Sequence, residues 1–215
     1  MIRTTDQLLE KIAEDIVWRR KELTDLKMMV QEFRGQLRSR VLIRCGVAIL
    51  YAHWEGFVKK CSSHYLEYVA SHRLPYKNLA ANFIGLTLKS KFLELGESKK
   101  ISGGNALADF FCNELDRQSN VPFKKIVDTK SNLSSEVLND ILHALGLDAS
   151  QFATRLKFLD TNLLKQRNHI AHGEVLDISF DEYLNLHDDV IALIDTYRNE
   201  IENAAVLRRF ERKVK

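Results

Sequence analysis

The sequence is poor in the residues that break helices or build covalent frameworks. It has two prolines and nine glycines in 215 residues, which is too few for a turn-rich all-β fold. Its three cysteines, Cys45, Cys61 and Cys112, are scattered and include no C-x-x-C pair. Neither a disulfide framework nor a zinc site is therefore indicated, and we expect reduced thiols in a fold made of long helices.

Two further absences bear on where the protein acts. The chain has no uninterrupted apolar run long enough to span a bilayer, and its first six residues lack the character of a signal peptide. We therefore expect a cytoplasmic protein with no membrane partner. The net charge of +3 is small, so it permits binding of nucleic acid without indicating it.

Apolar residues recur at helical spacing along most of the chain. Thr4 and Gln7 form a predicted capping box at the start of a helix that runs to about Gly35. Ser179 and Glu182 form another, followed by the most regular apolar stripe in the sequence. These patterns predict long amphipathic helices near both ends.

A second long helix is predicted over residues 39–72. Its small residues Cys45, Ala48, Ala52 and Gly56 share one face, where we expect a neighbouring helix to approach closely. The fold predicted from these patterns is all-α, a bundle of long helices with an irregular helical insertion. We assign residues 1–215 to a single domain, with a first helical pair at 1–72, an insertion or cap at 73–147, and a motif helix and final helix at 148–215.

The stretch Arg167-Asn168-His169-Ile170-Ala171-His172-Gly173 concentrates polar side chains at a predicted helix end. Residues four apart share a helix face, so Asn168 and His172 line up, while Arg167 lies about 100° away around the axis. Gly173 is the residue type expected just past a helix end, in the left-handed conformation. A turn there would let His172 swing back toward Arg167.

This set of groups suits cleavage of a phosphodiester. A guanidinium grips phosphate oxygens with two parallel hydrogen bonds and stabilises the charge of a pentacovalent transition state. An imidazole can take a proton from a ribose 2′-OH or return one to the leaving oxygen. The Asn168 amide could orient either partner. No metal or cofactor is needed, because RNA carries its own nucleophile.

Two other interpretations of the stretch stay open. A histidine near a helix C-terminus is favoured by the helix dipole, and a glycine after it is a common stop, so the pattern also fits an ordinary helix end. His169 and His172, three residues apart, could share a metal ion, although no second pair of ligands is evident in the sequence.

The spacing from Arg167 to His172, with Asn168 directly after the arginine, resembles the R-x4-6-H motif of the HEPN superfamily. The stretch Tyr51-Ala52-His53-Trp54-Glu55-Gly56-Phe57-Val58-Lys59 is similar to an early helix of the RiboL-PSP branch of that superfamily. The resemblance implies an all-helical fold and, by analogy, catalytic roles for Arg167 and His172 with Asn168 in support. Many relatives with this motif are metal-independent ribonucleases of toxin–antitoxin, CRISPR and anti-phage systems.

The resemblance also implies partners. Such proteins form homodimers in which two motifs face each other across a composite active site, and single-stranded or loop RNA is the expected substrate. An antitoxin or another protein of a defence system is the implied protein partner. Toxins controlled by a nucleotidyltransferase often carry a tyrosine two places after the histidine, and this chain departs from that pattern with Glu174.

Two residues outside the R-x4-H pair are expected to support it. Glu55 lies between Trp54 and Phe57 in an apolar stretch, so a buried Glu55 would need a partner such as Arg167 or an imidazole. A surface carboxylate or a purely stabilising ion pair is the alternative for Glu55. His169 lies within the motif itself.

We therefore expect an endoribonuclease that cleaves RNA by 2′-OH attack without a metal, acting as a toxin or an anti-phage effector. The alternative from another functional class is a catalytically silent HEPN-like module that binds a partner protein or a nucleotide.

Overall fold

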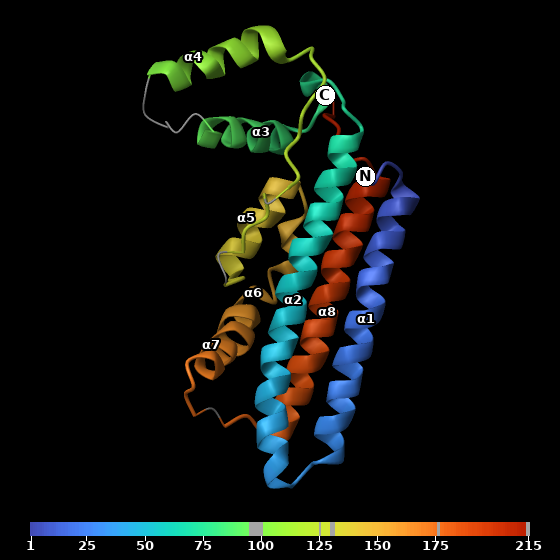
Figure 1. The fold of residues 1–215 in the computed structure, drawn as a ribbon, viewed down its shortest axis with the longest axis vertical. Helices are drawn as coiled ribbons and strands as arrows, with labels where there is room; N and C mark the ends of the chain where they lie inside the picture. The colour runs from blue at the N-terminus through green and yellow to red at the C-terminus, as the bar shows by residue number, and fades with distance from the viewer. Residues whose placement is uncertain (95–100, 125, 130–131, 176, 214–215) are drawn as a thin grey trace.

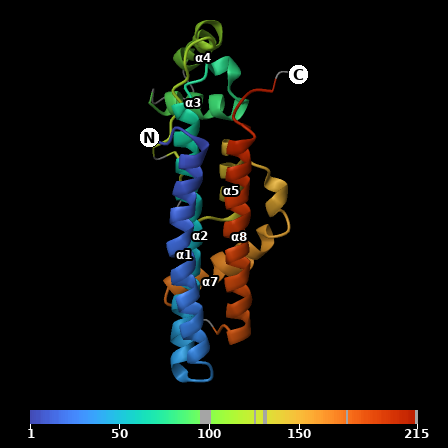
Figure 2. The same cartoon turned by 90° about the vertical axis from the view of Figure 1, so that its right-hand side faces the viewer.

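The computed structural model describes residues 1–94, 101–124, 126–129, 132–175 and 177–213, with the backbone alone at 92–94 and 101–103. The fold is all-α, as predicted. Three long helices, α1 (Thr5–Glu32), α2 (Leu37–Ser71) and α8 (Phe180–Val206), lie side by side as a bundle (Figures 1 and 2). Both chain ends lie at one end of this bundle, and the turn from α1 to α2 lies at the other.

The two predicted capping boxes begin the outer helices. The Thr4 side chain accepts from the Gln7 amide at the start of α1, and Ser179 accepts from Glu182 at the start of α8, with the return bond present in both. Each box satisfies backbone donors that have no partner inside the helix. Both boxes are confirmed.

Helix α2 is the central element of the bundle and packs against both α1 and α8. Its side chains Trp54, Phe57 and Tyr65 are fully buried. By length and composition alone α2 could cross a membrane, but 50% of its most apolar window is buried inside the protein. A central position in a bundle accounts for that composition.

The face of α2 predicted to receive another helix is used in part. An added Cβ at Gly56 would lie 3.1 Å from Arg19 Nη1 of α1, so a neighbouring helix does approach there. Cys45 and Ala52 are exposed. A closer approach occurs at Gly46, where an added Cβ would lie 2.5 Å from the Tyr183 ring of α8. The prediction therefore holds at Gly56 and fails at Cys45 and Ala52, because small residues occur on two faces of α2 and only the tertiary packing selects between them.

Shorter elements connect α2 to α8. They are a 3₁₀ turn (Tyr76–Asn78), α3 (Ala81–Glu94), α4 (Ile101–Asp109), a π-helical turn (Phe110–Glu114), α5 (Ser135–Leu145), a 3₁₀ turn (Ala149–Phe152), α6 (Leu156–Phe158), a second π-helical turn (Leu159–Leu164) and α7 (Lys165–Ala171). Helices α3 and α4 project at the end of the bundle where the termini lie, while α5, α6 and α7 descend beside α2 (Figure 1). The buried residues Leu138 and Leu142 of α5 join the main core.

The motif helix expected within residues 148–215 is α7, which is short and is preceded by several turns. Between Asp148 and the motif the chain forms the 3₁₀ turn, α6 and the second π-helical turn in succession. In that last turn Leu159, Leu163 and Leu164 are all buried. A π-helical turn holds an extra residue and is often found next to functional sites. Here it lets two adjacent leucines, 163 and 164, contact the core immediately before α7.

Candidate functional site

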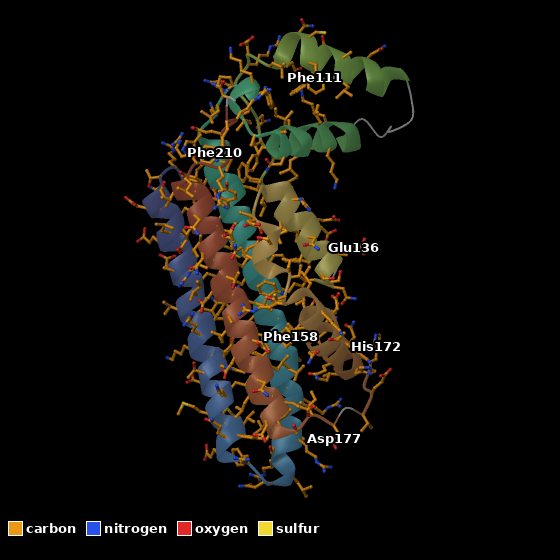
Figure 3. The ribbon with its side chains drawn as sticks, turned by 180° about the vertical axis from the view of Figure 1, so that it is seen from behind. Phe111, Glu136, Phe158, His172, Asp177 and Phe210 are labelled. Atoms are coloured by element: carbon orange, nitrogen blue, oxygen red, sulfur yellow. The ribbon has the colours of Figure 1, made fainter. Side chains whose placement is uncertain are left out.

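The motif lies on α7, which packs against α2. The His172 amide caps the helix by donating to the Asn168 carbonyl at 3.0 Å, and Gly173 follows with a φ of +74°. This is the left-handed helix end predicted from the sequence, where glycine meets no steric penalty. The chain then turns toward Asp177 and α8, and His172 lies at the outer edge of the molecule (Figure 3).

Arg167 is half-buried and held by protein groups on the α2 side of α7. Its Nη1 donates to Asn132 Oδ1 at 3.0 Å and to Asn168 Oδ1 at 2.9 Å. The guanidinium carbon lies 4.5 Å from the centre of the Tyr51 ring, a distance typical of a cation–π contact. These contacts restrict the guanidinium to one orientation, which is what a group that must meet a phosphate requires.

The ring of Tyr51 lies beneath the Arg167 guanidinium and is held in place by its surroundings. It is buried on α2, and its hydroxyl accepts from the Leu133 amide at 2.7 Å. Burial raises the pKa of Tyr51 to about 12, and the nearby Glu55 carboxylate adds to the effect. The phenol therefore stays protonated near neutral pH and cannot serve as the general base.

Asn168 connects Arg167 to an open pocket of about 300 Å³. The pocket is lined by Asp160, Leu164, Lys165, Asn168, His169, His172 and Glu174. The Asn168 carbonyl oxygen accepts from Arg167, so its amide nitrogen remains available toward the pocket.

The two histidines of the motif differ in their surroundings. His169 Nδ1 pairs with the Glu174 carboxylate, which orients its ring. The exposed His172 ring makes no hydrogen bond within the described part of the chain and is open to a bound molecule. Of the two, His172 is the better placed to exchange a proton with a substrate.

Glu55 lies near the site, with partners other than those expected. Its Oε1 accepts from the Thr129 hydroxyl and lies 3.2 Å from Lys59 Nζ. Glu55 is therefore positioned to anchor the segment around Thr129 against α2. A direct role of Glu55 in support of Arg167 stays a prediction.

Three residues of the connecting segment before α5 were not predicted to lie at the site. Thr129 bonds Glu55, Asn132 accepts from Arg167, and Leu133 donates to Tyr51. Nothing in their local sequence distinguishes them from an ordinary linker. They reach the site because Thr129 and Leu133 bond side chains of α2, and Asn132 bonds a side chain of α7.

Comparison with known proteins agrees with the resemblance seen in the sequence. The model of the RiboL-PSP-HEPN family matches residues 14–203, a range that includes both the Tyr51–Lys59 stretch and the R-x4-H stretch. No curated protein and no solved structure matches the chain. The family match covers most of the sequence and the fold is all-helical, so the chain belongs to the RiboL-PSP-HEPN family.

Proposed function

We propose that this protein is a metal-independent endoribonuclease acting on single-stranded or loop RNA in the cytoplasm. The observation that carries the proposal is that an oriented Arg167 is linked through Asn168 to an open pocket lined by His172, in a chain of this family. The groups match the needs of phosphodiester cleavage, which are charge stabilisation and proton transfer.

In the proposed reaction the ribose 2′-oxygen attacks the adjacent phosphorus. The 2′-oxygen–phosphorus bond forms, the bond to the 5′-oxygen of the next nucleotide breaks, and the products are a 2′,3′-cyclic phosphate and a free 5′-hydroxyl. Arg167 binds the phosphate oxygens on which negative charge accumulates. His172 transfers the proton, either from the 2′-hydroxyl or to the leaving 5′-oxygen.

A homodimer would supply the second proton-transfer group. One chain has one R-x4-H motif, whereas a two-fold axis beside the pocket would bring a second His172 to the same phosphate. One imidazole would then act as base and the other as acid. We propose this composite arrangement as the active form.

Cleavage of RNA in EDTA tests the proposal directly. We expect the parent to cut a single-stranded RNA in the presence of the chelator, and the products to end in a cyclic phosphate. Arg167→Ala and His172→Ala should each lower the rate by roughly 10²-fold or more, since each removes a group that acts in the transition state. Circular dichroism should show unchanged helix content.

Matched controls are available at exposed or remote positions. His143→Ala at the C-terminal end of α5 and Arg198→Ala on α8 remove the same chemical groups away from the pocket and should cleave at the parental rate. If Arg167→Ala and His172→Ala cleave as well as these controls, the nuclease proposal is wrong. Cleavage that EDTA abolishes would indicate a metal-dependent enzyme using His169 and His172.

One observation favours the silent binding module instead. Arg167 donates to Asn132 and Asn168 and lies over the Tyr51 ring, and such a set of contacts also fits an arginine with a structural role. In that case the parent would cut no RNA under any condition. Arg167→Ala would then lower the melting temperature without a catalytic effect.

We further propose a role as a toxin or anti-phage effector. Expression in a bacterial host should slow growth, and the His172→Ala variant, expressed at the same level, should not. Equal growth inhibition by the two proteins would contradict this role.

A further inference from the structure

The positive charge of the chain is concentrated in two short segments. Residues 34–44 contain four arginines and no acidic residue, which is a local charge of +4 in a chain whose total is only +3. Residues 208–215 contain five basic residues and one acidic residue, again +4. The remainder of the protein is therefore net negative, at −5, so these two segments carry a disproportionate share of the positive charge.

Each segment contains both paired and unpaired basic residues. In the C-terminal segment Arg208 pairs with Glu211 at 2.5 Å and Arg209 with Glu200 at 3.0 Å. Arg212 and Lys213 of that segment, like Arg38 and Arg40 at the start of α2, are exposed and form no ion pair with any described residue. Among the described residues, the one ion pair of segment 34–44 joins Arg34 to Asp181 at 3.9 Å.

The stability of α2 does not explain these arginines. No acidic residue occurs in the first turn of α2, and the side chain of its N-cap residue, Gln36, makes no capping bond. Positive side chains near a helix N-terminus oppose the helix dipole and weaken the helix slightly. The arrangement suits a surface that receives an anion from outside the chain.

Helical geometry aligns two of the arginines with the candidate site. Arg40 and Arg44 are four residues apart, and Arg44 and Tyr51 are seven residues apart. At these spacings the three side chains share the face of α2 on which α7 packs. At 1.5 Å per residue, Arg40 and Tyr51 are about 17 Å apart along the axis. Tyr51 carries the Arg167 guanidinium, so three guanidinium groups follow one line.

A direct contact joins this line to the pocket. Arg44 Nη1 donates to the Glu174 carbonyl at 2.8 Å, and Glu174 itself lines the pocket two residues after His172. The start of α2 lies at the end of the bundle opposite both termini, below α7 in Figure 1. The basic C-terminal segment therefore lies far from the site.

We propose that Arg40 and Arg44 bind the phosphates of an RNA strand that continues from the candidate active site along the start of α2. The inference rests on the proposed function, since it extends the substrate already assigned to that site. Stacked nucleotides advance about 3.4 Å each, so a line of about 17 Å corresponds to roughly five nucleotides beyond the scissile bond. These contacts position the strand and carry no sequence information.

We call this proposed row of phosphate contacts at Arg40 and Arg44 the track. Cleavage of RNAs of two lengths tests it. For the double variant Arg40→Gln/Arg44→Gln at low salt, kcat/KM for a 20-nucleotide RNA should fall roughly tenfold, because KM rises. Cleavage of a 4-nucleotide RNA, which is too short to reach the two arginines, should stay at the parental rate. A 20-nucleotide single-stranded DNA has the same phosphates and no 2′-hydroxyl, so it should bind without being cut. Its Kd should rise by a similar factor, and the slope of log K against log salt should fall by about 0.7 per lost contact.

Two matched variants separate charge from other effects. Arg212→Gln/Lys213→Gln removes two exposed charges at the other end of the bundle and should change neither measurement. Arg40→Lys/Arg44→Lys keeps the charge and should stay within about threefold of the parent. If this lysine variant fails like the glutamine variant, the loss of the Arg44 contact to Glu174 is responsible and the track is overturned.

The remaining outcomes are also decisive. A parent that cuts RNA, with Arg40→Gln/Arg44→Gln equally effective on both lengths, would overturn the track and leave the proposed function intact. A parent that neither binds nor cuts RNA would remove the proposed function and the track with it. If the parent binds vesicles containing 30% phosphatidylserine through the same two arginines, and binds no nucleic acid, the surface is a membrane contact and the track is wrong.

Discussion

Tyr51, together with Asn132 and Asn168, holds Arg167 in position. The Tyr51 ring lies under the guanidinium, and its hydroxyl holds the Leu133 amide. Tyr51→Phe should cost about 1–3 kcal/mol of stability, because the Leu133 amide loses its buried acceptor, yet cleavage by the folded protein should stay near the parental rate. Tyr51→Leu also removes the ring face and should lower cleavage roughly tenfold.

Thermal unfolding and RNA cleavage, the latter measured well below both melting temperatures, separate these two effects. Equal cleavage by the folded leucine and phenylalanine variants would show that the ring does not position Arg167. Comparing the leucine and phenylalanine variants tests only whether Tyr51 positions Arg167, since Tyr51 is not placed to touch the substrate.

His53 lies in a buried polar cluster on the other side of α2. Its Nδ1 faces Arg19 Nη1 at 3.4 Å, its Nε2 lies 2.9 Å from Glu22, and Asp15 pairs with Arg19 at 2.7 Å. A ring nitrogen facing a guanidinium must act as acceptor, so the imidazole is neutral and donates through Nε2. Burial lowers the pKa of His53 below its ordinary value of 6.5, and the same holds for His64.

This shift predicts acid sensitivity. As the pH decreases, His53 and His64 take up protons at a higher pH in the unfolded chain than in the folded protein. Their contribution to the free energy of unfolding is therefore fully present above about pH 6.5 and is lost as the pH falls below that value. Urea unfolding at pH 7.5 and 5.5 should show a lower free energy of unfolding at pH 5.5. His53→Gln should reduce this difference, while His143→Gln, at an exposed position, should not. An unchanged difference in His53→Gln would exclude His53 as a source of the pH dependence.

At the scale of single elements, Gly46 determines how closely α2 and α8 approach. A Cβ there would lie 2.5 Å from Cε2 and 2.8 Å from the hydroxyl oxygen of Tyr183, whose side chain is fully buried and cannot move freely. Gly46→Ala should therefore destabilise the protein by about 1–3 kcal/mol despite the higher helix propensity of alanine.

Gly85 in α3 is the matched control, because a Cβ there meets nothing within 4 Å. Gly85→Ala should be neutral or stabilise by up to about 1 kcal/mol, since only the helix propensity changes. Chemical unfolding of the two variants measures the difference. A Gly46→Ala protein as stable as Gly85→Ala would show that α8 shifts to accommodate the methyl group.

At the scale of the whole molecule, the proposed composite site requires two chains. We expect light scattering at micromolar concentration to give a mass twice the 24.8 kDa of one chain. Specific activity should fall on dilution below the dimer dissociation constant, because a single chain holds only one His172. A monomer that retains full specific activity at every concentration would exclude the shared site.

The elements of this fold were predictable to different degrees. The capping boxes at Thr4 and Ser179 and the glycine end at Gly173 follow from contacts within one helical turn, so the local sequence was sufficient. The short length of the motif helix α7 and the turns before it were not predicted. The buried leucines there fit a helical stripe equally well, and the π-helical turn that holds them arises from packing against the core.

The sequence by itself determined the all-helical class, the position of the R-x4-H stretch at a helix end, and the family resemblance that the comparison confirmed. These features depend on residues a few positions apart, whose geometry is set by the helix. Only the tertiary structure decided that Asn132 binds Arg167 from 35 residues away, and that Tyr51 holds Leu133 from 82 residues away. Such contacts arise from the way α2, α7 and the segment before α5 pack together, and the same local patterns are compatible with many other packings.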